Sequence, residues 1–372
     1  MAYRSLRRPS DSVHPRRILY VAYPLLPVSH ESCGGAEQML SVLEDEMARR
    51  GHYTSVAACA GSQARGSVMV TGAETVEPDR FSTRNAEHHA RILEFLNSPQ
   101  HHALPFDLIH DKSGSFWPRA AESEIPVLAT LHLPRHFYSE EVFRKVPKNV
   151  MFNCVSAAQY RSFQNVLHVI GVIENGIHVH RFPFITEKQD YLLWLGRVCE
   201  EKGPHLAIEV ARRTGLPLVM AGQVYPFSYH QTFYNAKIRP HLASLHPTIS
   251  FRETPTFQTK ARLLSRARAL LVPSLVNETS SLVAMEAMVC GTPVIGFRRG
   301  ALPEVVIDRL TGFIVDDVDQ MVEAVWNADQ INAHACRTHV ESNYSSTRMA
   351  AQYEELYERI LASRESPRTQ AA

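Results

Sequence analysis

Residues 269–294, ALLVPSLVNETSSLVAMEAMVCGTPV, decide the fold class of this chain. An apolar run is followed by a polar loop, by a segment with helical spacing that ends near Gly291, and by a second apolar run from Pro293. A strand, a loop, a helix and a strand in this order make a βαβ unit, from which parallel sheets are built. The stretch therefore predicts an α/β protein.

The same stretch contains two glutamates. Glu278 falls in the polar loop, whereas Glu286 falls in the helix, where its side chain leans back toward the N-terminus. Ligands of open parallel sheets bind beyond the carboxyl ends of the strands, where this loop lies. We expect both carboxylates to face one pocket, with the backbone N–H groups of residues 279–281 at the positive end of the helix dipole. Alone, the pair is equally compatible with a solvated glutamate and a glutamate that solubilises a helix.

The βαβ pattern extends outward from this stretch in both directions. In the second half we expect strands at 191–195, 217–221, 269–272 and 293–296 and helices at 204–214 and 281–290. In the first half we expect strands at 17–22, 127–131 and 152–155 and helices at 36–50 and 86–96. The pattern breaks in the polar run 180–190, so we predict two doubly wound parallel-sheet domains, residues 1–185 and 186–345. Residues 346–372 are predicted to form a docked helix, at about 345–361, and a frayed tail from Ser363.

Two cations follow the strand predicted at 191–195. Arg197 and Lys202 lie in the loop before the helix at 204–214. Arg197 offers a planar guanidinium and Lys202 a compact charge, and together they could neutralise a diphosphate. Each cation alone is typical of a surface residue. Because both lie in the same sheet as the two glutamates, the pair favours a phosphate-bearing ligand.

Two weaker signals occur in the first half of the chain. Gly34 and Gly35 follow the first predicted strand and open a helix, so the backbone there can approach a ligand closely. His132 ends the strand at 127–131, which places an imidazole at the mouth of a cleft between the domains. A buried structural histidine is an equal alternative for this residue.

Composition excludes several classes of function. The chain has 39 basic and 38 acidic residues, so its net charge of +1 gives no field that would attract nucleic acid. No apolar run approaches the roughly 20 residues that span a bilayer. The basic N-terminus, residues 1–17, lacks the apolar region of a secretory signal and is predicted to be a solvated arm, with a membrane or acceptor contact as the alternative. Six scattered cysteines favour reduced thiols in the cytoplasm over a disulfide frame or a zinc site.

Other motifs are excluded by spacing. No two glycines are separated by a single residue, which removes the dinucleotide fingerprint of dehydrogenases. Gly61 and Gly66 have P-loop spacing, but Ser67 stands where the phosphate-binding lysine would be. Asp317 and Asp319 directly precede an amphipathic segment, so helix capping is favoured over metal binding.

Taken in order along the chain, five short motifs resemble the family 4 retaining glycosyltransferases of GT-B fold over residues 16–362. These motifs are GGAE at 34–37, TLH at 130–132, NGI at 175–177, GR with EKG within 196–203, and E-x7-E followed by GTPV within 278–294. The resemblance implies two Rossmann-like domains that face a central cleft. It also implies a nucleotide-sugar donor held mainly by the C-terminal domain, and a last helix that crosses back to the N-terminal domain.

Matched motif by motif, the resemblance implies a role for each candidate residue. Arg197 and Lys202 would hold the donor diphosphate, and Glu286 would bind the ribose hydroxyls. Glu278 and His132 are the implied catalytic residues, Glu278 contacting the transferred sugar and His132 lining the reaction centre. The remaining implied donor-binding residues are Gly34 and Gly35, which close on the donor, and Ser280, Ser281 and Leu282. No metal and no bound cofactor are implied.

This chain departs from the family pattern at three places. Ser280 and Ser281 replace the usual Phe-Gly, His178 replaces a common Asp, and Glu253 replaces a common Gly. The donor sugar and base are therefore the least determined features, although we favour a UDP-sugar. The acceptor, a saccharide, a lipid-linked molecule or a small molecule, matches no motif.

Other functions stay open at this point. A GT-B-like epimerase or phosphorylase would share the scaffold, and a non-catalytic protein could bind the nucleotide sugar. A glycoside hydrolase also uses paired carboxylates but has no need of two cations for a diphosphate. The expected location is the cytoplasm. A peripheral contact with the inner membrane face is the alternative to a solvated basic edge at Arg135, Arg144, Lys145 and Lys148.

Overall fold

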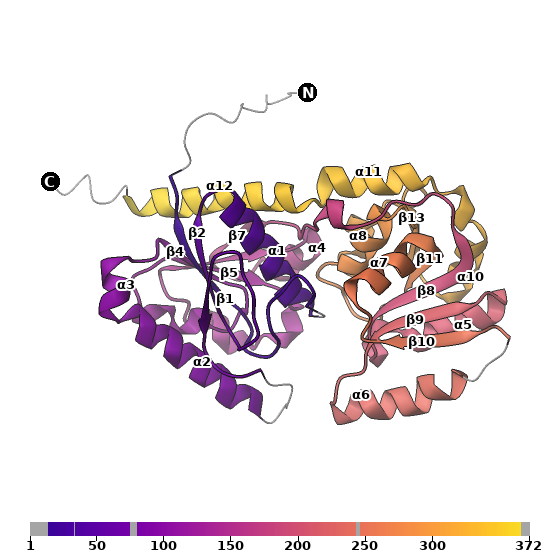
Figure 1. Ribbon diagram of the computed structural model, residues 1–372, viewed down its shortest axis with the longest axis horizontal. Coiled ribbons are helices and arrows are strands. Elements are labelled where there is room, and N and C mark those ends of the chain that lie inside the picture. Colours follow the sequence, from indigo (N-terminus) through magenta and orange to yellow (C-terminus); the bar gives the residue numbers. More distant parts are fainter. Residues whose placement is uncertain (1–13, 33, 75–79, 243–245, 366–372) are drawn as a thin grey trace.

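The computed structural model describes residues 14–32, 34–74, 80–242 and 246–365 of the chain (Figure 1). Its strands form two sheets, and every pairing within them is parallel. The seven-stranded sheet has the order β3-β2-β1-β4-β5-β6-β7, and the six-stranded sheet has the order β10-β9-β8-β11-β12-β13. The predicted fold class, two doubly wound parallel-sheet domains, is confirmed.

The N-terminal sheet contains β1 (Arg17–Val21), β2 (Tyr53–Ala58), β3 (Ser67–Val70), β4 (Leu108–Asp111), β5 (Val127–Leu131), β6 (Val150–Cys154) and β7 (Val169–Val172). The C-terminal sheet contains β8 (Gln189–Arg197), β9 (Leu218–Gln223), β10 (Ile249–Glu253), β11 (Ala267–Val272), β12 (Val294–Phe297) and β13 (Gly312–Val315). The α-helices are α1 (Gly35–Arg49), α2 (Phe81–Leu96), α3 (Pro99–Ala103), α4 (Ala157–Ser162), α5 (Pro204–Thr214), α6 (Ser228–Phe233), α7 (Phe257–Arg266), α8 (Leu282–Val289), α9 (Leu302–Val305), α10 (Val318–Trp326), α11 (Ala333–Asn343) and α12 (Ser346–Glu365).

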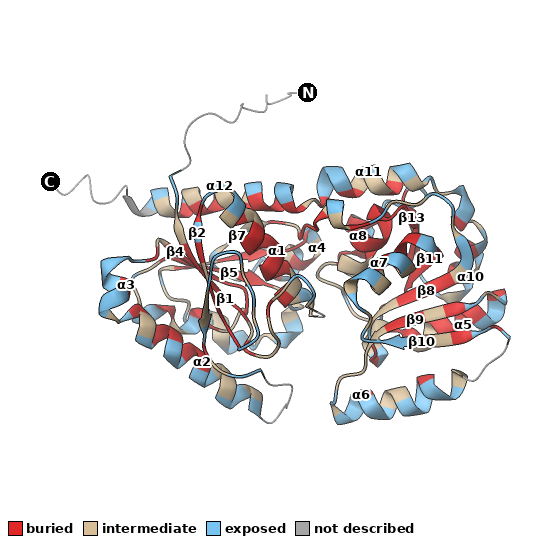
Figure 2. Cartoon of the chain, viewed as in Figure 1, coloured by how far each residue is buried: buried red, intermediate tan, exposed pale blue. Residues whose placement is uncertain are grey.

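Helices cover both faces of each sheet, which buries the central strands on both sides. All residues of β4, β5 and β12 are buried, and Figure 2 shows the exposed residues on the outer faces of the helices. The edge strands β3 and β10 are partly exposed instead.

Helix α12 connects the two domains. It follows α11 on the C-terminal domain and lies along the N-terminal domain in Figure 1. Arg16 pairs with Glu358 of this helix at 2.6 Å, and the hydroxyl of Tyr357 lies 2.6 Å from Nδ1 of His110 on β4. These contacts fix α12 against the N-terminal sheet.

Both chain ends differ in part from expectation. The frayed tail is expected from Ser363, but α12 continues to Glu365, so the helix is longer than predicted. Arg16 and Arg17 do not belong to a solvated arm, since Arg16 pairs with α12 and Arg17 begins β1. The rest of the predicted arm up to residue 13, and the tail from residue 366, lie outside the described residues.

The buried histidines of the N-terminal domain include His88, His89 and His110. Burial lowers the pKa of His88 and of His89 from 6.5 to about 4, and it holds the pKa of His110 well below 6.5. Between these values and 6.5 the unfolded chain binds more protons than the folded chain. The free energy of unfolding therefore falls as the pH falls below 6.5.

On going from pH 7 to pH 5, we expect the free energy of unfolding to fall by about 2 kcal/mol for each of His88 and His89. Urea denaturation at both pH values measures this loss. His89→Asn should abolish the part of this pH-dependent loss that comes from His89. His102→Asn, at an exposed position, should leave the loss unchanged. The same pH dependence in wild type and His89→Asn would contradict the assignment.

Candidate functional site

A cavity of about 410 Å³ lies between the two domains. The C-terminal domain lines it with the ends of β8, β9 and β11 and with the loop before α8. The N-terminal domain contributes the start of α1, including Gly34, Gly35 and Gln38. This is the place where ligands of open parallel sheets bind.

A second cavity, of about 590 Å³, adjoins the first. The residues that line both cavities are Gly34, Gly35, Arg197, Tyr225, Ser280 and Leu282. The second cavity extends into the N-terminal domain and reaches His132 and the loop after β1. The two cavities form one continuous site with two compartments.

Every candidate residue from the sequence lines one of these compartments. Lys202, Glu278, Ser281 and Glu286 line the first cavity, His132 lines the second, and Gly34, Gly35, Arg197, Ser280 and Leu282 line both. The fold thus gathers the candidates at one place. It does not by itself assign their roles.

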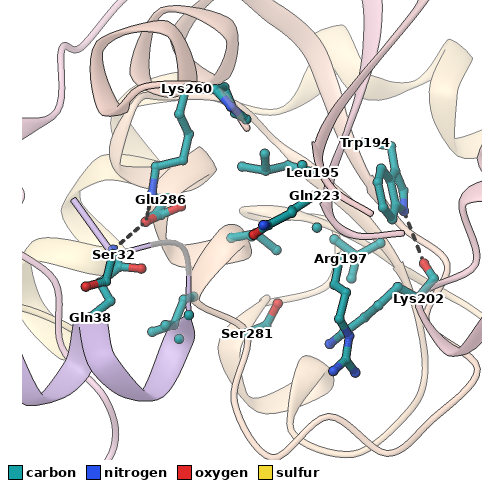
Figure 3. Close-up of a pocket in the computed structure, with 18 of the residues that line it drawn as sticks. Ser32, Gln38, Trp194, Leu195, Arg197, Lys202, Gln223, Lys260, Ser281 and Glu286 are labelled. Atoms are coloured by element: carbon teal, nitrogen blue, oxygen red, sulfur yellow. Dashed lines mark hydrogen bonds and ion pairs between the residues drawn. The ribbon is translucent and has the colours of Figure 1, made fainter. Parts of the chain in front are cut away.

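The loop after β8 carries both cations into the first cavity. Figure 3 shows the side chains of Arg197 and Lys202 extending into the same part of the pocket. The backbone oxygen of Lys202 accepts a hydrogen bond from Nε1 of Trp194 at 3.1 Å. Gly203 ends the loop with a φ of 64°, and a Cβ there would lie 2.1 Å from the carbonyl oxygen of Pro273. Only glycine permits this approach, which holds the loop against the segment before Glu278.

Glu278 and Lys202 form an ion pair inside the first cavity. The lysine Nζ lies 2.6 Å from Oε1 and 2.8 Å from Oε2 of the carboxylate. The hydroxyl of Ser274 donates to Oε1 at 2.7 Å. The family resemblance implies that Lys202 binds the diphosphate and that Glu278 contacts the sugar. It does not imply that the two side chains pair with each other. Any anion that bound Lys202 would therefore have to share it with Glu278.

Glu286 is held by two residues that the sequence pattern does not identify. Its side chain is 2% exposed, and Oε1 accepts from Lys260 Nζ on α7 at 2.6 Å and from Gln38 Nε2 on α1 at 2.9 Å. A buried carboxylate requires such partners. Neither bond uses Oε2. Figure 3 shows this cluster at the opposite end of the pocket from Arg197.

His132 lies where the domains meet, at the end of β5. Its carbonyl oxygen accepts a hydrogen bond from the hydroxyl of Thr279 at 2.7 Å, which joins the N-terminal sheet to the loop before α8. Burial, together with the charge of Lys112, holds the pKa of His132 well below 6.5. The imidazole is therefore neutral at pH 7. Its Nε2 is buried without a hydrogen-bond partner among the described residues.

Two motifs outside the site have structural roles. Asp317 caps α10 by accepting from the backbone N–H of Gln320 at 2.9 Å, as predicted, and Asp319 pairs with Arg213 at 2.7 Å. Arg135, part of the predicted basic edge, pairs with Glu140 at 2.6 Å and lies over the ring of Phe143. This arginine is not a free cation, because its charge is compensated locally.

Comparison with known proteins adds a family match to this geometry. Residues 178–331 match the family described as "Glycosyl transferases group 1". Among curated proteins, the chain is 33% identical to a glycogen synthase of Mycobacterium tuberculosis over 205 residues, which cover 50% of this chain and 48% of that protein. It is 30% identical to the D-inositol 3-phosphate glycosyltransferase of Mycolicibacterium paratuberculosis over 140 residues, which cover 37% of this chain and 31% of that protein. The alignments thus span about half or less of these relatives.

Solved structures resemble the whole chain. A sucrose-phosphate synthase from Thermosynechococcus elongatus has a TM-score of 0.76 at 18% identity and covers 94% of this chain and 100% of its own. Anabaena HepE in complex with UDP-glucose has a TM-score of 0.72 at 15% identity, and the match covers 92% of this chain and 99% of HepE. At these identities the likeness shows the fold, which is GT-B. The finer family 4 assignment stays a prediction.

Proposed function

Because the chain carries a group 1 glycosyltransferase domain within a GT-B fold, we propose that it transfers a sugar from a nucleoside diphosphate sugar to an acceptor. The observation that carries this proposal is the gathering of Arg197, Lys202, Glu278 and Glu286 around one cavity between the domains. The volume of about 410 Å³ is typical of small-ligand sites. A glycoside hydrolase would not require the two cations.

The donor would lie along the first cavity. Arg197 and Lys202 would bind the diphosphate through charge-assisted hydrogen bonds. At the other end, Oε2 of Glu286 is the carboxylate oxygen left to accept from the ribose hydroxyls, since Oε1 is used by Lys260 and Gln38. A UDP-sugar remains the favoured donor, and HepE, which shares the fold, was solved with UDP-glucose.

The proposed reaction retains the anomeric configuration. The bond between the anomeric carbon and the diphosphate breaks, and the acceptor hydroxyl forms the new bond on the same face of the sugar. The proton of that hydroxyl passes to the departing diphosphate. Fixed cations stabilise the charge that develops on the leaving group, so no divalent metal is required there. Neutral His132 can contact the sugar but is a poor proton donor at pH 7.

The second cavity is proposed to hold the acceptor. Its apolar lining comes from Tyr23, Leu25, Leu26, Phe81, Leu133 and Phe227. Apolar walls favour an acceptor that combines a reactive hydroxyl with an apolar portion. Within the part of the chain that the structure describes, no helix is long and apolar enough to cross a bilayer.

Donor turnover followed by NMR tests the proposed reaction. A panel of nucleotide sugars is incubated with the protein, with candidate acceptors and without added metal. We expect nucleoside diphosphate release and a product with the donor's anomeric configuration, with no gain on adding Mg²⁺ or Mn²⁺. An inverted product, or strict dependence on Mn²⁺, would contradict the mechanism. Phosphate-dependent release of a sugar phosphate would indicate a phosphorylase, and an isomerised sugar an epimerase.

Glu286→Gln is expected to weaken binding of UDP, or of whichever diphosphate binds, by about tenfold, because a charged acceptor for the ribose hydroxyls is lost. Isothermal titration calorimetry measures the change. The control is Glu323→Gln, at an exposed position on α10. If Glu286→Gln binds the nucleotide as wild type does, the ribose assignment is wrong.

A further inference from the structure

Three side chains converge beside the loop that carries the two cations. Cys199 and Glu201 belong to this loop, and His230 belongs to α6. One sulfur, one carboxylate oxygen and one ring nitrogen from these residues all lie within 4.8 Å of one another. None of the three residues lines either cavity. The cluster is therefore separate from the proposed donor and acceptor positions.

His230 is the member of this cluster whose environment is least satisfied. Its side chain is fully buried, and neither ring nitrogen has a hydrogen-bond partner among the described residues. The rings of Phe227 and Tyr229 pack against it, with centroid distances of 5.3 and 4.1 Å. Leaving a buried polar group unpaired destabilises the folded protein. A ligand that bonds to this imidazole would remove this destabilisation.

Cys199 and Glu201 supply the chemistry that such a ligand would need. Cys199 is fully buried, and its thiol lies 3.6 Å from the carbonyl oxygen of Arg197 and within hydrogen-bonding range of the Glu201 carboxylate. Glu201 is half-buried, so its carboxylate can adjust. A thiolate and an imidazole together select a borderline-soft cation such as Zn²⁺ over Mg²⁺ or Ca²⁺, which prefer oxygen. With the thiolate and the carboxylate, a bound Zn²⁺ would have no net charge, which suits a site beside Arg197.

We propose that Cys199, Glu201 and His230 bind a zinc ion. Zinc bonds of about 2.0 to 2.3 Å require the ligand atoms to lie roughly 3 to 4 Å apart. The ligand atoms now lie within 4.8 Å of one another, so the widest separation has to close by about 1 Å through small side-chain rotations. Water would complete the tetrahedron. The predicted absence of a zinc site relied on the spacing of cysteines alone, and that spacing does not reveal one cysteine joined by His and Glu.

The proposed ion has a structural consequence. It would tie the loop after β8 to α6 and so hold the backbone between Arg197 and Lys202. This positioning role rests on the proposed function, whereas the binding of zinc does not. The ion is distinct from a metal at the donor diphosphate, which the proposed mechanism does without.

Cobalt substitution tests the site without any nucleotide or sugar. We expect the full chain to bind one Co²⁺ with a near-ultraviolet thiolate-to-cobalt charge-transfer band, and Zn²⁺ to displace it. The band should disappear in Cys199→Ser, weaken in Glu201→Gln and persist in Cys59→Ser, where another buried thiol is changed. Circular dichroism checks that each variant is folded.

Two results would overturn the proposal. The first is that wild-type protein, folded and reduced, binds no Co²⁺ with a charge-transfer band. The second is that the band persists in Cys199→Ser. The positioning role has its own test, in which zinc should raise the affinity of the protein for UDP several-fold. Equal affinities of the zinc-loaded and zinc-free protein would overturn the positioning role. Because cobalt binding is read without donor, a failure of the transferase proposal does not alter the outcome for the metal site.

Discussion

Glu278→Gln is expected to lower donor turnover by about 10²- to 10³-fold, the scale of losing one preorganised electrostatic contact in a transition state. Glutamine preserves the shape of the side chain but removes the negative charge next to the transferred sugar. The affinity for the nucleoside diphosphate should stay the same or rise. The reason is that Lys202, now bound by both carboxylate oxygens at 2.6 and 2.8 Å, would be free to contact the phosphates.

Steady-state kinetics and calorimetry on the same variant separate these two effects. Glu323→Gln, at an exposed position on α10 that lines neither cavity, is the matched control. A variant that turns over the donor as fast as wild type would contradict the role given to Glu278. A parallel loss of diphosphate affinity would instead indicate that Glu278 acts by organising the phosphate site.

Removing either cation is expected to weaken nucleoside diphosphate binding by about 1.5 to 3 kcal/mol, or roughly 10- to 150-fold. Lys202→Ala should have the larger effect, since it also leaves Glu278 without its ion-pair partner beside the phosphates. The double variant Lys202→Ala, Glu278→Gln should then regain part of the lost affinity. Arg197→Ala leaves that ion pair intact and should show the smaller loss.

Arg252→Ala, at an exposed position on β10 outside both cavities, is the control for the cation variants. Unchanged affinity in folded Arg197→Ala and Lys202→Ala would remove the diphosphate assignment. No recovery in the double variant would show that the Glu278 carboxylate does not oppose the phosphates.

The sequence predicts those parts of the site that short segments define. Glu278 and Glu286 are separated by one loop and about one turn of helix, so helix geometry alone brings both toward one cavity. Gln38 and Lys260 could not be predicted in this way. They reach Glu286 from 248 and 26 residues away, on helices whose packing depends on the whole fold. The pairing of Lys202 with Glu278 is likewise a tertiary contact.

The fold shows the same division. The sequence predicts the strands whose apolar runs mark buried parallel strands, namely β1, β5, β6, β8, β9, β11 and β12. It does not predict β2, β3, β4, β7, β10 or β13. Strand β4, with the sequence LIHD, is fully buried although half of its residues are polar. Hydrogen bonds from neighbouring elements satisfy these side chains: Tyr357 contacts His110, and backbone N–H groups donate to Asp111. These hydrogen bonds come from other elements of the fold, so the sequence of β4 alone does not predict that its polar residues can be buried.

The central claim is that the cavity between the domains binds a nucleoside diphosphate through Arg197 and Lys202. A thermal-shift titration tests it most directly, because a ligand that binds the folded state raises the Tm with concentration. Wild type and the Arg197→Ala, Lys202→Ala double variant are titrated with UDP, ADP, GDP and TDP. We predict that at least one diphosphate, with UDP favoured, raises the Tm of wild type and leaves the double variant unchanged. No shift with any diphosphate, or equal shifts in both proteins, would contradict the claim.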